Sequence, residues 1–281
     1  MIKTRSRFPA KIGFAAALFS ILISLSACEK SAYEKAEEKN TIEGFERFLK
    51  KYPEGEHSRT AMGHLAQLYF VKVTTENTIA GYEDYLQRFP TAITRGEIIE
   101  RLASLTKAEI AALTIDQMAQ MQGLIKTDLG DIKLRFFPQK APETCRNFIK
   151  LAKIHFYDTS QFIVIVPGVF IQGGAPKGDP VAGPGYTIKA EFNDLKNIPG
   201  AVGMVRGENP DSAGSQFYIC LKSLPDRDGK YTVFAQVEDG MDIAEAISSQ
   251  ESSGPEGAPY PFRPVKPIVI RAVEIVQEKQ R

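Results

Sequence analysis

The chain has 281 residues, 43% of them hydrophobic, so it can form one large domain or two ordinary domains with a buried core. Its 35 basic and 34 acidic residues give a net charge of +1, and this balance argues against a nucleic-acid partner. Three cysteines and three histidines are scattered too widely for a metal-ligand pattern, so we expect no metal site.

Residues 1–27 are predicted to be a targeting segment. Basic residues precede an apolar stretch over residues 12–25, which is shorter than the about 20 residues that span a bilayer. The stretch ends in Leu-Ser-Ala-Cys, which resembles the cleavage box of bacterial lipoproteins and implies that Cys28 is lipidated and holds the protein to membrane lipid. An ordinary signal peptide with an incidental cysteine is the alternative. Glu29, in place of an aspartate, favours the outer membrane in a cell that has one, with the protein facing the periplasm.

Residues 28–119 are predicted to form a helical segment with an internal repeat. Residues 77–90 resemble residues 40–53 in sequence, at an offset of 37 positions. In both stretches apolar residues at helical spacing precede a proline that ends the helix. Each unit is predicted to be a helix, a turn and a second helix, which resembles a tetratricopeptide repeat, although that repeat usually has about 34 residues. We expect the aromatic residues to form core between helices rather than a ligand groove, and a protein partner to bind the repeats.

Residues 120–281 are predicted to form a second domain, because the pattern changes there to short alternating runs. Residues 124–136 are typical of a hairpin, and an amphipathic helix begins at Pro142. Many short strands, with a second short helix near 242–249, favour a closed antiparallel β-barrel, so the expected fold class is α+β. The other predicted strands lie near residues 162–166, 169–172, 201–205, 216–220, 231–237 and 267–276.

Four stretches of this second domain resemble the bacterial cyclophilins in content, order and spacing. They are residues 141–148, 162–174, 203–219 and 228–234. The resemblance implies a cyclophilin-type barrel that binds proline-containing polypeptides and catalyses rotation about Xaa-Pro bonds without a cofactor. In that family an arginine stabilises the twisted amide, an apolar pocket holds the proline ring, and a glutamine and backbone groups hold the flanking peptide.

The match to this family is uneven at the site itself. Gln172 and Gln216 take the two glutamine positions and are the predicted catalytic residues, whereas Val164 stands at the position of the arginine. Since a charge-assisted hydrogen bond contributes about 1.5–3 kcal/mol, we expect reduced isomerase activity. The resemblance implies substrate contacts from Phe162, Val164, Val169, Phe170, Val205, Arg206, Tyr218, Arg227 and Tyr231.

Two other functions stay open beside a membrane-tethered isomerase that assists the folding of exported proteins. The same barrel could serve as a proline-peptide-binding chaperone or adaptor without turnover, and Val164 favours this reading over an efficient enzyme. In a third hypothesis the helical repeats bind partners and the barrel is a spacer. The partners of residues 29–119 alone would distinguish this last hypothesis from the other two.

Two arginines near the predicted pocket each allow two interpretations. Arg206 either touches the substrate or braces its own loop. Arg227 stands where the family has a leucine that lines the pocket. It either reaches over the pocket and replaces the missing guanidinium, or it is a solvated loop charge beside Asp226 and Asp228.

Two cysteines remain after Cys28. Cys145 and Cys220 both lie in apolar surroundings, which favours buried free thiols. A disulfide between them is the alternative in an oxidising periplasm.

Overall fold

The computed structural model describes residues 28–277 of the chain, so the predicted targeting segment lies outside the described residues. By internal packing the chain divides into two compact units, with the division between Arg95 and Gly96. None of the helices within residues 28–277 is long and apolar enough to cross a membrane. We describe each unit by itself.

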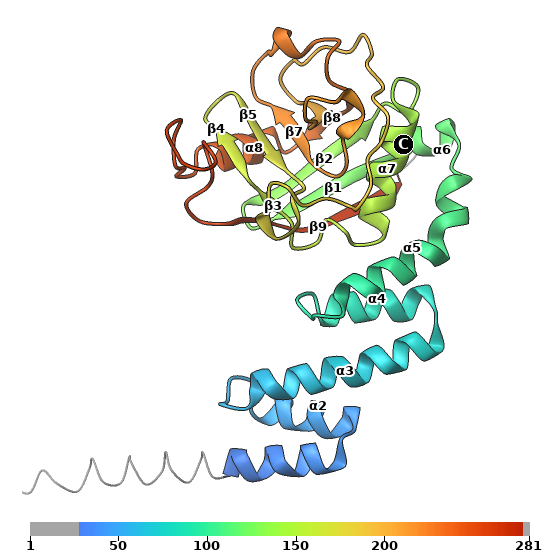
Figure 1. Cartoon of the computed structure of the whole chain (residues 1–281), viewed down its shortest axis with the longest axis vertical. Helices are drawn as coiled ribbons and strands as arrows, with labels where there is room; N and C mark the ends of the chain where they lie inside the picture. Colours follow the sequence, from blue (N-terminus) through green and yellow to red (C-terminus); the bar gives the residue numbers. More distant parts are fainter. Residues whose placement is uncertain (1–27, 278–281) are drawn as a thin grey trace, which may run out of the picture. The chain divides into compact units, whose positions relative to one another are not determined.

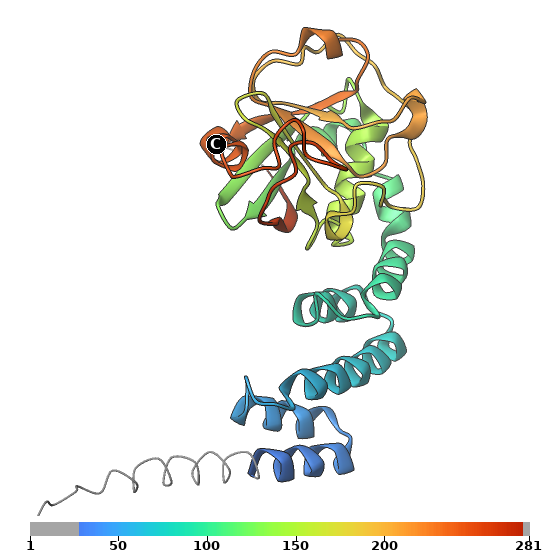
Figure 2. The same cartoon turned by 60° about the vertical axis from the view of Figure 1, so that its left-hand side comes forward.

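The first unit is a set of helices. Residues 28–39 are helical, and α2 (Ile42–Lys51), α3 (Ser58–Glu76) and α4 (Ile79–Arg88) follow. α2 packs against α3, and α3 packs against α4 (Figure 2). Membership of the tetratricopeptide class stays a prediction.

The two copies of the internal repeat begin their helices in the same way. The Thr41 hydroxyl oxygen accepts the backbone N–H of Gly44 at 3.1 Å, and the Thr78 hydroxyl oxygen accepts that of Gly81 at 3.1 Å. Such N-caps satisfy a backbone donor that the helix itself leaves unpaired. The local sequence therefore defines the start of α2 and of α4.

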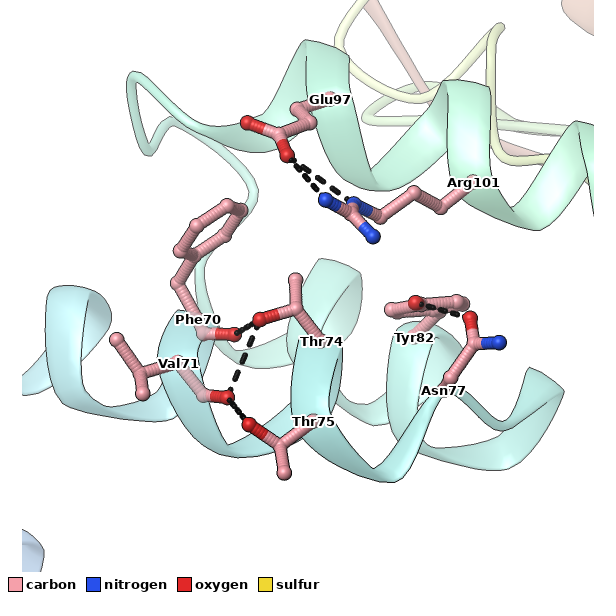
Figure 3. Close-up of polar contacts among 8 residues, drawn as sticks. All are labelled: Phe70, Val71, Thr74, Thr75, Asn77, Tyr82, Glu97 and Arg101. Carbon is pink, nitrogen blue, oxygen red and sulfur yellow. Dashed lines mark hydrogen bonds and ion pairs between the residues drawn. The ribbon is translucent and has the colours of Figure 1, made fainter.

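Aromatic side chains form the core of this helical unit. Phe45, Tyr82 and Tyr85 are 0% exposed, which confirms the prediction that the aromatic stripe is core. The Tyr82 hydroxyl donates to Asn77 Oδ1 at 2.6 Å, at the end of α3 (Figure 3). In the last turns of α3 the hydroxyl of Thr75 donates back to the Val71 carbonyl at 2.8 Å, as the same figure shows.

The second unit begins with two helices, the second of which packs on the barrel. α5 (Arg95–Ala111) lies in this unit apart from its first residue, and α6 (Ile115–Ala119) contacts β1 and β2. Lys153 Nζ lies 2.6 Å from Glu109 Oε1, and an Arg146 guanidinium nitrogen donates to the Leu113 carbonyl at 3.0 Å. The division by internal packing falls at the first residue of α5, whereas the sequence predicted a boundary between residues 119 and 120.

The rest of this unit is a nearly closed antiparallel barrel, which confirms the expected fold class (Figure 1). Neighbouring strands follow the order β3-β9-β1-β2-β8-β6-β7-β5-β4, and every pair is antiparallel. The two end strands are consecutive in the chain, and the backbone N–H of Ile163 between them donates to the Gln172 carbonyl at 2.8 Å. The strands are β1 (Met121–Thr127), β2 (Gly130–Phe136), β3 (Gln161–Phe162), β4 (Val164–Val166), β5 (Phe170–Gly173), β6 (Ala201–Met204), β7 (Phe217–Cys220), β8 (Val233–Asp239) and β9 (Ile268–Gln277).

Two helices cover the barrel. α7 (Pro142–Lys153) packs against β9 and β8, and α8 (Met241–Ser248) packs against β2 and β5 (Figure 1). The α7 side chain Phe148 is 0% exposed and lies in aromatic contact with Phe217 of β7 and Phe234 of β8. This core holds the strands of the site in place.

Both remaining cysteines lie inside this unit as free thiols. Cys145 and Cys220 are each 0% exposed and form no disulfide, which confirms the interpretation as buried thiols. Burial raises the pKa of the Cys220 thiol to about 12, so it stays protonated at neutral pH.

Candidate active site

The strands β4, β5, β7 and β6 bring four residues into one row across the sheet. Val164 is the register partner of Gln172, Gln172 of Tyr218, and Tyr218 of Gly203. Residues directly opposite one another in a sheet present their side chains on the same face. Ile171, in the alternate position next to Gln172, is 0% exposed in the barrel core. The side chains of Val164, Gln172 and Tyr218 therefore lie on the face of the sheet that points away from the barrel core.

The two glutamines meet at this row. Gln172 Nε2 donates to Gln216 Oε1 at 2.9 Å, and both side chains are half-buried. Gln216 Nε2 in turn donates to the Pro180 carbonyl at 2.9 Å. The structure thus brings the two predicted catalytic residues together, beside a loop that supplies further backbone carbonyls.

An aromatic cluster lies next to the glutamines, where the sequence predicted the proline pocket. The buried Tyr218 ring packs edge-on against Phe170, with ring centroids 6.5 Å apart, and against Tyr231 at 5.9 Å. Four of the predicted substrate-contact residues therefore share one cluster, in which Tyr218 is fully buried and the other three are half-buried. The cluster consists of Ala201, Tyr218, Cys220 and Val233 with Phe170, Leu195, Val205, Leu224 and Tyr231.

A glycine makes room for the Tyr218 ring. A Cβ atom built on Gly203 would lie 2.3 Å from the Tyr218 ring and hydroxyl, closer than atoms can approach. The hydroxyl donates to Asn197 Oδ1 at 2.6 Å, and Asn197 Nδ2 donates to Asp228 Oδ1 at 3.0 Å. Burial raises the pKa of the Tyr218 phenol, so it stays a hydrogen-bond donor at neutral pH.

Arg227 reaches over the pocket rather than into solvent. Its guanidinium carbon lies 4.4 Å from the ring centroids of Phe170 and Tyr218 and 5.3 Å from that of Tyr231. A guanidinium in such positions makes cation–π contacts. The interpretation of Arg227 as a solvated loop charge is therefore wrong, because three rings offer its planar group a better surface than its acidic neighbours in the chain.

Arg206 braces its loop. Its Nε donates to the Lys230 carbonyl at 2.9 Å, and one terminal nitrogen donates to the Gly207 carbonyl at 2.9 Å. Its guanidinium carbon also lies 4.7 Å from the Tyr231 ring centroid. Of the two interpretations, these contacts favour bracing.

Two predicted contact residues stand apart from this cluster. Phe162 is 1% exposed and packs under Gly173 in the barrel core, away from the row of Val164 and Gln172, so the structure gives no support to its predicted substrate contact. Strand alternation would place Phe162 on the same face as Val164, two positions later, but the alternation is interrupted at Ile163, which belongs to neither β3 nor β4. Val169 is half-buried in the turn between β4 and β5, and its carbonyl accepts the Leu221 N–H at 2.9 Å.

Several residues of the site carried no sequence signal. Asn197, Leu195 and Leu224 lie in loops without periodicity, and Pro180 is one of many loop prolines. Only their contacts with Tyr218 and Gln216 assign them to the site. Within residues 28–277, no group of three or more histidine, cysteine or acidic side chains could hold a metal ion.

Comparison with known families agrees with this geometry. Residues 123–275, more than half of the chain, match the family model described as cyclophilin type peptidyl-prolyl cis-trans isomerase/CLD. The chain belongs to this cyclophilin family. The prediction of a cyclophilin-type domain is thereby confirmed, whereas the lipoprotein signal stays a prediction.

Curated cyclophilins and solved structures show the same likeness. A peptidyl-prolyl cis-trans isomerase of Synechococcus elongatus is 43% identical over 119 residues, which is 42% of this chain and 81% of that protein. Peptidyl-prolyl cis-trans isomerase B of Bacillus subtilis is 40% identical over 124 residues, 43% of this chain and 86% of that protein. A Cryptosporidium parvum cyclophilin crystallised in the presence of the dipeptide Ala-Pro has a TM-score of 0.51 and 28% identity, over 57% of this chain and 99% of that chain.

Proposed function

We propose that the barrel catalyses cis–trans isomerisation of Xaa-Pro bonds in exported proteins, at a reduced rate. The observation that carries this proposal is the hydrogen-bonded pair of Gln172 and Gln216 beside the aromatic pocket of Phe170 and Tyr218. Membership of the cyclophilin family and the isomerase names of its relatives support it. The Ala-Pro dipeptide used with the Cryptosporidium structure supports a proline-containing ligand.

The chemistry needs a surface that favours a twisted amide. The barrier to rotation about an amide bond is about 18–20 kcal/mol, because the bond is conjugated. A site that holds the peptide on both sides of the proline and binds the twisted form more tightly lowers this barrier. The rings of Phe170 and Tyr218 supply an apolar seat for proline, and the amides of Gln172 and Gln216 supply donors and acceptors for the flanking backbone.

The reduced rate follows from Val164. This side chain lies across from Gln172 and has no hydrogen-bond donor for the prolyl nitrogen. A charge-assisted hydrogen bond is worth about 1.5–3 kcal/mol, which corresponds to a rate loss of about 10- to 150-fold. Replacement of the missing guanidinium by Arg227 stays a prediction, and a loss of rate in Arg227→Ala would support it.

The second candidate is a proline-peptide-binding chaperone or adaptor without turnover. Two observations favour it, namely the valine at position 164 and the guanidinium of Arg227 over the rings of the pocket. In this role the barrel would bind extended segments that contain proline and release them unchanged.

The proposed place of action is the cell envelope. Lipid attached to Cys28, an exposed residue at the start of the described chain, would tether the protein to a membrane, by preference the outer one, facing the periplasm. The helices of residues 28–88 would offer a surface to a protein partner. Both parts of the proposal rest on the sequence pattern.

A proline-isomerisation assay with Val164→Arg tests the proposal. The wild-type chain should accelerate isomerisation of an Ala-Pro peptide above the rate in buffer, measured by exchange NMR. Val164→Arg places a guanidinium directly across the strands from Gln172 and should raise the rate about tenfold or more.

A second arginine variant controls for added charge. Val269→Arg introduces arginine at a half-buried valine on β9, outside the site, and should leave the wild-type rate unchanged. A wild-type rate equal to that in buffer, with peptide binding retained, would replace the enzyme by the binding module. No peptide binding by either protein would remove both functions.

A further inference from the structure

Arg227 is held at the pocket by its backbone as well as by the rings. It ends a short 3-10 turn (Pro225–Arg227), in which its N–H donates to the Leu224 carbonyl at 3.0 Å. Its own carbonyl accepts the N–H groups of Lys230 at 3.0 Å and Tyr231 at 3.2 Å. The backbone bonds fix where the side chain starts, and its contacts with three rings restrict the guanidinium, so it loses less freedom when a ligand binds than an open surface arginine does.

The guanidinium of Arg227 has no carboxylate partner among residues 28–277. None of the ion pairs in that part of the chain includes it. Asp228, the next residue in the chain, is paired with other groups. Its Oδ2 lies 3.4 Å from Lys196 Nζ, and its Oδ1 accepts hydrogen bonds from the backbone and side chain of Asn197. The three rings surround the guanidinium but carry no negative charge, so they do not neutralise it.

A second arginine raises the positive charge at the same place. Arg206 contacts the Tyr231 ring at 4.7 Å, and it too takes part in no ion pair within the described part of the chain. Its hydrogen bonds go to the backbone carbonyls of Lys230 and Gly207, which carry no charge that could neutralise it. Two guanidinium groups therefore share one aromatic ring at the pocket.

We propose that Arg227 makes this site selective for proline peptides that carry a carboxylate on a residue next to the proline. The inference rests on the proposed function, since it names the class of peptide that the site prefers. A guanidinium binds a carboxylate through two parallel hydrogen bonds, and it keeps its ring contacts while doing so. Since Arg227 is half-buried, salt screens such a pair less than it screens a pair on the open surface.

Matched peptides test this selectivity on the full chain. The probes are acetyl-Ala-Glu-Pro-Ala-amide and acetyl-Ala-Pro-Glu-Ala-amide, each compared with its glutamine counterpart by NMR titration at pH 7. With glutamate either before or after the proline, at least one glutamate peptide should bind about tenfold more tightly than its glutamine counterpart, which corresponds to about 1.4 kcal/mol of binding free energy. In Arg227→Leu the ratio of the glutamate-peptide affinity to the glutamine-peptide affinity should fall to about one.

A matched control separates the site from general charge effects. Arg135, an exposed arginine on β2, contacts the Phe137 ring at 5.2 Å outside the site, so Arg135→Leu should keep the wild-type preference. Equal affinities of wild type for glutamate and glutamine peptides in both positions would overturn the selectivity and leave the proposed function standing. If no proline peptide bound at all, the proposed function would fall, and the selectivity with it.

Discussion

Tyr218 links the pocket surface to buried polar groups beneath it. Its ring forms contacts with Phe170 and Arg227, and its hydroxyl reaches the buried Asn197. Asn197 then donates from backbone and side chain to Asp228, which lowers the pKa of that carboxyl. A single residue therefore shapes the aromatic cluster and positions the loop that carries Arg227.

The variant Tyr218→Phe isolates the hydroxyl from the ring. It leaves the buried Asn197 Oδ1 without its donor at 2.6 Å, so we expect a loss of about 1–3 kcal/mol in the free energy of unfolding, measured in urea. Binding of a proline peptide should persist, because the ring stays. Tyr260→Phe, at a ring that is 40% exposed, should change the stability by less than about 0.5 kcal/mol. An equal loss in both variants would argue against a special role for Asn197.

At the scale of elements, the helices of the first unit depend on their first residues. The caps at Thr41 and Thr78 are formed by the same residue type with the same geometry. Both helices are only 10 residues long, and short helices are marginally stable, so one capping hydrogen bond contributes a large share of the stability of each.

Removal of one cap should weaken this unit. For Thr78→Ala we expect a loss of about 1 kcal/mol, because the Gly81 N–H loses its acceptor, with urea unfolding followed by circular dichroism. Thr75→Ala is the matched control, since Thr75 is exposed within α3 and donates only to the Val71 carbonyl of its own helix (Figure 3). This variant should stay within about 0.5 kcal/mol of wild type. A loss in Thr75→Ala as large as that in Thr78→Ala would contradict the capping argument.

For the whole molecule, the place of action depends on Cys28. If this residue carries lipid, the wild-type chain produced in bacteria should incorporate labelled palmitate and sediment with membranes. Cys28→Ala should lose both the label and the sedimentation. Cys220→Ala replaces a buried thiol and should keep both. Equal labelling of wild type and Cys28→Ala would refute the lipid anchor.

The amino-acid sequence by itself determined the elements and the family. Caps, prolines and apolar spacing act over a few residues, so the helices of the repeat followed from local pattern. The four cyclophilin-like stretches predicted the barrel and the meeting of Gln172 with Gln216, since family motifs carry the register of the strands with them.

Only the tertiary structure decided what depends on contacts between distant segments. The Arg227 side chain lies on rings from β5, β7 and the loop before β8, and no local pattern reveals which of two environments a loop arginine takes. Phe162 turned inward because its pocket under Gly173 is made by a neighbouring strand. The ion pair between Lys153 of α7 and Glu109 of α5 likewise joins segments that are far apart in the chain, and it forms only when the chain folds.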